Sequence, residues 1–130
     1  MCDYSLERVD QREARSNETL VTARIGDHKT MGLISPGKPD TAVCLVSGMR
    51  ARISVSPAMA RDFGISAGPA MATFTQRELP GDAVDYRDGF VFDESPDEQH
   101  LLQEFDAGVA IVPVEVDNTL VEQKRELINA

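Results

Sequence analysis

Apolar and polar side chains begin to alternate at Thr19, and this pattern continues to Ile25. A second β-like run, Lys29–Ser35, follows after the short segment Gly26-Asp27-His28. Two runs of this kind joined by a short Gly-Asp turn predict a β-hairpin.

The run Thr41–Ser47 is apolar on both of its faces. Such a run predicts a central strand that is covered on both sides, with Cys44 buried as a small hydrophobic side chain. The preceding segment, Ser35–Asp40, contains two prolines and a glycine, and these residues predict a loop.

Alternating charged and apolar residues in Arg50–Ser56 predict a strand with one face in water. Ser56-Pro57 then supplies an N-cap and a first-turn proline, so a short helix is expected to run to Phe63 and to end at Gly64. Another strand is expected at Ala70–Gln76.

In the C-terminal half, Asp88-Gly89 predicts a hairpin turn between strands at Val84–Tyr86 and Phe90–Phe92. A helix is expected to begin at Ser95-Pro96, within a segment that has acidic residues and no basic ones. Pro113 interrupts the β-type run Val109–Val116 and places it at a sheet edge or a bulge.

Residues 117–130 place apolar side chains on one helical stripe and predict a C-terminal helix. Residues 1–18 carry mixed charge and predict a lead-in segment. The sum is one domain over 1–130, mainly β in an α+β arrangement. We expect a small β-barrel or β-roll of five to seven short strands with two or three short helices.

The net charge of −9, from 22 acidic and 13 scattered basic residues, argues against binding to nucleic acid or to an anionic membrane. No run approaches the ~20 apolar residues that span a bilayer. The N-terminus is charged from residue 3 and lacks the apolar core of a secretory signal. These features predict a cytoplasmic protein in which both cysteines are free thiols.

Three features that could suggest a binding site have simpler interpretations. Gly32–Lys38 matches the start of a phosphate-binding loop, but Pro39 replaces the required hydroxyl residue, so no nucleotide site is expected. His28 is expected at a solvated hairpin tip, and helical spacing places His100 on an exposed face. The acids Asp93, Glu94, Asp97 and Glu98 lack the spacing of a calcium loop. The residues single out no cofactor and no metal.

Cys2 carries the most pointed chemistry of the sequence. Removal of Met1 would leave a thiol beside a free α-amine, a combination that can act as a nucleophile with its own base or as a metal or redox ligand. The alternative is a frayed terminus whose cysteine is incidental. If Tyr4 and Leu6 dock this segment on the domain, the Cys2 thiol is expected near Cys44 or His28.

The opening Met1–Leu6, together with Thr41–Leu45, resembles a family of short bacterial proteins of uncharacterised activity. The likeness extends through Phe74, Gln76 and the Tyr86–Gly89 turn, about two-thirds of the chain. This resemblance implies a bacterial cytosolic setting, transfers no activity, and singles out the pair Cys2 and Cys44.

The leading hypothesis is therefore a small cytosolic protein whose chemistry centres on the Cys2 thiol. Asp3, Tyr4, His28 and Cys44 are its expected accessory residues. The alternative is a non-catalytic binding or regulatory module, with a homodimer or another protein bound at a sheet edge near Val109–Val116. An accessory subunit of a larger enzyme is a third possibility.

Overall fold

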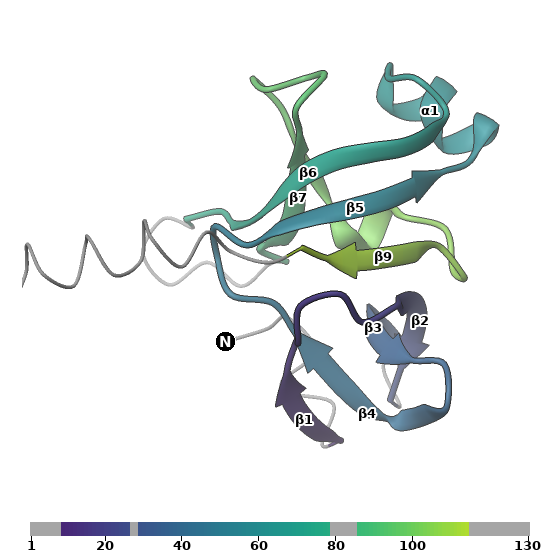
Figure 1. The fold of residues 1–130 in the computed structure, drawn as a ribbon, viewed down its shortest axis with the longest axis vertical. Coiled ribbons are helices and arrows are strands. Elements are labelled where there is room, and N and C mark those ends of the chain that lie inside the picture. The colour runs from purple at the N-terminus through teal and green to yellow at the C-terminus, as the bar shows by residue number, and fades with distance from the viewer. Residues whose placement is uncertain (1–8, 27–28, 79–85, 115–130) are drawn as a thin grey trace, which may run out of the picture.

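The structure is a computed structural model that describes residues 9–26, 29–78 and 86–114. These residues form one nine-stranded sheet in the order β1-β4-β3-β2-β9-β5-β6-β7-β8 (Figure 1). All neighbours are antiparallel except β1 and β4, which are parallel. The strands are β1 Asp10–Glu13, β2 Leu20–Ile25, β3 Thr30–Ser35, β4 Lys38–Cys44, β5 Arg50–Val55, β6 Gly68–Gln76, β7 Asp88–Phe92, β8 Gln99–Leu101 and β9 Ala110–Pro113.

The sheet is strongly curved. In Figure 1, β1–β4 lie below and β5–β7 lie above, with β9 between the two groups. Beyond β8, the 3-10 turn η2 (Leu102–Glu104) returns to β3. There the Gln103 side chain donates to Met31 O at 2.8 Å and accepts from Met31 N at 2.9 Å. One amide side chain thus pairs with the β3 backbone and fixes one end of the sheet to its other half.

The core fills the inside of this curve. Leu20, Leu33, Ile53 and Ile111, from β2, β3, β5 and β9 in turn, are fully buried, and all five phenylalanines of the chain are buried on the β6–β8 side. Burial of a side chain of this size contributes about 1.5–3 kcal/mol. The described part of the chain contains no helix that is both long and apolar enough to cross a membrane.

The fold class predicted from the sequence is wrong. The sheet has nine strands rather than five to seven, and the described residues contain one α-helix, α1 (Pro57–Phe63), besides the η2 turn. That helix has the predicted caps: Ser56 accepts from Met59 N at 3.2 Å, and Gly64 adopts a φ of 69°. The helix expected at 117–130 lies outside the described residues. The mainly β character is confirmed.

Three local predictions fail because pairing with a neighbouring strand outweighs the local pattern. The segment after Ser95-Pro96 forms β8 and η2 instead of a helix, since Gln99–Leu101 pairs with β7. Asp88-Gly89 is not a turn but the start of β7, paired with Gln76 and Thr75. The predicted edge strand, β9, lies inside the sheet between β2 and β5, so it offers no edge for a dimer.

The loop predicted over Ser35–Asp40 is also shorter than expected. Ser35 pairs with Lys38, so only Pro36 and Gly37 form the turn, and β4 starts at Lys38. The next pair of the β3–β4 ladder is Ile34 with Ala42, so the register shifts between Ser35 and Ile34 and leaves extra residues on β4. Pro39 therefore sits in a bulge, where its missing N–H interrupts no ladder hydrogen bond.

The Thr22 hydroxyl connects β2 to the start of β9. It donates to Asp106 O at 2.6 Å and accepts from the buried Val109 N at 2.9 Å. Thr22→Val should therefore cost about 1–3 kcal/mol, because it leaves the Val109 N–H buried without an acceptor. Urea unfolding measures the loss, and Thr22→Ser, which keeps the hydroxyl, should recover most of it. Equal losses in both variants would show that the hydroxyl bonds are unimportant.

Candidate functional site

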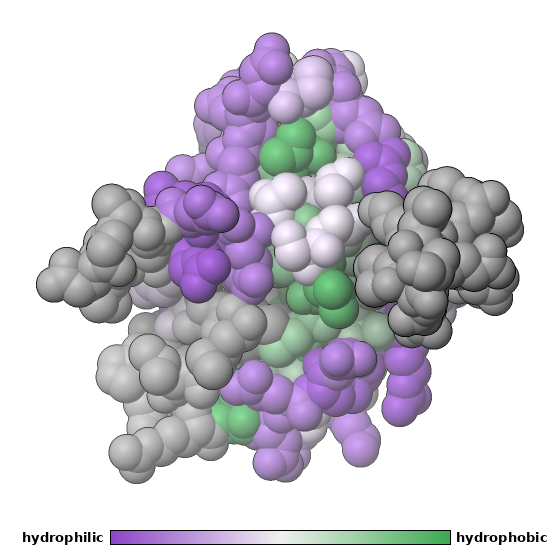
Figure 2. Space-filling model, turned by 90° about the vertical axis from the view of Figure 1, so that its left-hand side faces the viewer, coloured by the Kyte–Doolittle hydropathy of each residue, from purple (hydrophilic) through white to green (hydrophobic). Residues whose placement is uncertain are grey.

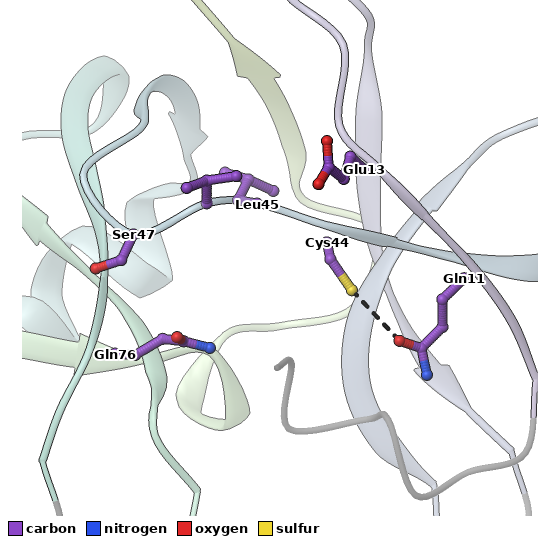
Figure 3. A pocket seen from close by; sticks show the side chains of 7 residues that line it. Gln11, Glu13, Cys44, Leu45, Ser47 and Gln76 are labelled. Carbon is purple, nitrogen blue, oxygen red and sulfur yellow. Dashed lines mark hydrogen bonds between the residues drawn. The ribbon is translucent and has the colours of Figure 1, made fainter. Parts of the chain in front are cut away.

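A pocket of about 350 Å³ opens where the ends of three strands meet (Figure 3). The ends of β1 and β4 form one wall of the pocket, and the segment that follows β4 forms a second wall. The end of β6 forms the third wall. The lining residues are Gln11, Glu13, Cys44, Leu45, Val46, Ser47 and Gln76. The molecular face on the left of Figure 1, seen in Figure 2, has a strip of apolar and neutral residues between hydrophilic ones.

The segment between β4 and β5 is held against β6 by backbone hydrogen bonds. Gly48 N donates to Phe74 O at 2.8 Å, and Phe74 N donates to Met49 O at 2.8 Å. Gly48 has a φ of 95°, a conformation in which a side chain would be strained. The resulting turn leaves Val46 55% exposed at the pocket. Val46 was predicted to lie in a strand with no face in water, and that prediction is wrong because β4 ends at Cys44.

Arg50 anchors the far end of this segment. Its guanidinium donates to both oxygens of Asp93 at 2.6 Å and to Thr73 Oγ1 at 3.0 Å, which ties β5 to the residue after β7. These hydrogen bonds lower the pKa of Asp93 from its ordinary value.

Because the folded pKa of Asp93 is lowered, the stability from this pair is present above the unfolded value near pH 4 and is lost as pH falls through the folded value. Both side chains are more than a third exposed, so the loss should stay below about 1 kcal/mol. Urea unfolding between pH 6 and pH 2 should show this increment in the wild type and not in Asp93→Asn. A larger acid loss in the variant would contradict it.

Cys44 lies at the end of β4, half-buried on the pocket wall. It pairs with Glu13 of β1 in parallel register, and Ala14 N donates to its backbone O at 2.9 Å. Its Sγ lies 3.7 Å from Oε1 of Gln11, toward which it points in Figure 3. Cys44 is disulfide-bonded. The predictions of a buried hydrophobic Cys44 and of two free thiols are therefore both wrong.

The sequence contains one other cysteine, Cys2, which lies outside the described residues. The other predicted site residues Asp3, Tyr4 and His28 also lie outside them. Cys44 is thus the one predicted site residue that the structure places in the pocket.

Glu13 is the one charged side chain among the described residues that line the pocket. The neighbouring cation, Arg12, donates instead to Glu18, with Nη1 2.9 Å from Oε2. This hydrogen bond lowers the pKa of Glu18 and raises that of Arg12. The basic group of β1 is therefore paired with Glu18, and the charge that the described lining residues give the pocket wall is negative.

Gln76 links the pocket to a buried carboxylate that the sequence did not single out. Its Nε2 donates to Oδ1 of Asp88 at 2.8 Å, and Asp88 is fully buried at the start of β7. The only hint in the sequence was an acid that directly precedes an apolar β-type run, and the Asp-Gly pair favoured a turn instead.

His100 is buried, contrary to its predicted exposure, because β8 replaces the expected helix. Its ring stacks on the Phe63 ring with a centroid distance of 4.3 Å. It packs edge to face with the Phe92 ring at a centroid distance of 5.8 Å. Two of the acids between β7 and β8 have other partners, since Asp93 binds Arg50 and Glu94 accepts from Ser66 N and Oγ. Within the described ranges no group of three or more potential metal ligands is brought together.

No protein-family model, no curated protein and no solved structure matches the chain.

Proposed function

We propose that the protein is a thiol–disulfide redox protein in which Cys44 and Cys2 form a reversible disulfide. The observation that carries this proposal is the disulfide-bonded Cys44 on the wall of an open pocket. Since the sequence contains two cysteines, a bond within the chain requires Cys2 as the partner. The proposal keeps the chemistry at Cys2 but assigns it to redox exchange rather than to a nucleophile with a free α-amine.

The position of Cys44 favours an exchangeable bond over a purely structural one. Thiol–disulfide exchange requires that a thiolate reach a sulfur atom along the S–S axis, so access to the bond limits its rate. Cys44 is half-buried and lines an open pocket. The expected cytoplasmic setting strengthens the case, because disulfides there are usually transient, catalytic or redox-sensing.

Reversal of the bond changes the protein in a defined way. Reduction adds two electrons and two protons, and it leaves one thiol on each cysteine. The Cys44 thiol then has an acceptor at once, since Oε1 of Gln11 lies 3.7 Å from its sulfur. The bond would also secure the chain ahead of β1, which is an edge strand that pairs only with β4 among the described strands.

Peptide mapping without reduction tests the pairing. Trypsin is expected to cut after Arg8, Lys29 and Arg50 but not after Lys38, because Pro39 follows it. The oxidised protein should give one cross-linked species that joins residues 1–8 to residues 30–50, and dithiothreitol should separate the two peptides.

The cross-linked species should be absent from Cys44→Ser, which serves as the control. Recovery of both peptides with alkylatable thiols from the oxidised protein would reject the proposal. A link between two copies of the 30–50 peptide would also reject it, and would favour a disulfide-linked dimer.

A further inference from the structure

A carboxylate, that of Glu13, lies beside the disulfide-bonded Cys44. Glu13 and Cys44 are register partners on neighbouring parallel strands, and both line the pocket. Glu13 is exposed, and its carboxylate forms no ion pair with any other residue that the structure describes. Because Arg12 is bound to Glu18, the negative charge of Glu13 is not neutralised from its own strand.

The other described side chains that line the pocket are neutral. Gln11 and Gln76 supply amides, Ser47 supplies a hydroxyl, and Val46 supplies an exposed aliphatic surface. Figure 3 shows Gln76 and Ser47 on the side of the pocket opposite Gln11. A short aliphatic chain that ends in an ammonium group matches this lining. Its methylene groups would contact Val46, and its charge would pair with Glu13.

We propose that the pocket selects small disulfides that carry an ammonium group, and that Glu13 determines this specificity. This inference rests on the proposed redox function. Anionic disulfides are disfavoured at the same place, because a second carboxylate would be repelled by Glu13.

The exchange is balanced as follows. In the reduced protein, the Cys44 thiolate attacks one sulfur of a small disulfide RSSR, forms a mixed disulfide and releases RS⁻, which takes up a proton. The Cys2 thiolate then attacks the Cys44 sulfur, closes the protein disulfide and releases the second RS⁻. The protein loses two electrons and two protons, and RSSR becomes two RSH.

The test compares the oxidation of the reduced protein by cystamine, which carries two ammonium groups, and by the uncharged 2-hydroxyethyl disulfide. The ratio of the two rates cancels the intrinsic reactivity of the Cys44 thiol. Glu13→Gln should lower the ratio about two- to fivefold, the range of an exposed ion pair. The difference between wild type and variant should shrink in 1 M salt.

Asp62→Asn is the matched control, since it removes one negative charge from the exposed surface of α1 and leaves the pocket lining intact. Its rate ratio should equal that of the wild type. An unchanged ratio in Glu13→Gln, or an equal fall in Asp62→Asn, would overturn the assignment of specificity to Glu13. If neither disulfide converts the reduced protein to a species lighter by two hydrogen atoms, the redox function itself is rejected.

Discussion

Replacing Gly89 with alanine should destabilise the protein by about 2–4 kcal/mol, the range of severe overpacking. A Cβ at this position would lie 2.6 Å from the backbone O of His100 and 3.0 Å from Nε2 of Gln99. The backbone atom belongs to the paired strand β8 and cannot rotate away. The variant should therefore separate β7 from β8.

The Gln99 side chain explains why β7 needs a glycine here. It crosses over Gly89 to donate to Thr75 Oγ1 at 2.8 Å and to Arg87 O at 3.2 Å. Any side chain on Gly89 displaces this amide, and the bridge between β8 and β6 is then lost.

Urea unfolding followed by circular dichroism measures the effect of Gly89→Ala. Gly37→Ala is the matched control, because no atom beyond its own chain neighbours lies within 4 Å of the Cβ that would be added there. It should change the free energy of unfolding by no more than about 0.5 kcal/mol. A comparable midpoint for the two variants would contradict the close approach of β8 to β7.

Loss of the proposed disulfide should have the other large effect. A bond between Cys2 and Cys44 closes a loop of more than 40 residues, for which the reduction in unfolded-state entropy corresponds to about 3–4 kcal/mol. The oxidised wild type should therefore resist urea best. Reduced wild type, Cys2→Ser and Cys44→Ser should all unfold at a similar, lower concentration.

The loss of stability on reduction should also be confined to one part of the sheet. Hydrogen exchange after reduction should accelerate first in β1, whose four residues are all exposed or half-buried and which pairs only with β4 among the described strands. The β6 amides should keep their protection. A Cys2→Ser variant as stable as the oxidised wild type would show that Cys2 is not the partner of Cys44.

Local patterns predicted the parts of this fold whose reasons are local. Ser56-Pro57 and Gly64 define α1 correctly, because caps act within one helical turn. The alternation in Arg50–Val55 likewise predicts β5, whose buried and exposed residues alternate. Elements placed by distant partners were missed. β8 is a strand because its backbone pairs with the edge of β7. The helical spacing of the apolar residues near β8 contains no information about this distant partner.

The candidate site was predictable only in part. The resemblance singled out Cys2 and Cys44, but the local pattern predicted a buried Cys44 and two free thiols, so the disulfide was missed. The surroundings of Cys44 were not predicted, because Glu13 and Gln76 reach the pocket only through the parallel β1–β4 pair and the contact of the β4–β5 segment with β6. Both depend on residues 25 or more positions apart, which no local pattern connects.

A redox titration of the purified protein would show whether the bond between Cys2 and Cys44 forms and breaks reversibly. The protein is equilibrated in buffers with graded ratios of reduced to oxidised dithiothreitol. Free thiols are then alkylated, and the intact mass is measured by mass spectrometry. We expect one two-electron transition in which both cysteines change together from alkylated thiols to a single bond within one chain. Cys44 that stays alkylatable under oxidising conditions, or a transition that appears only in covalent dimers, would contradict a reversible bond between Cys2 and Cys44.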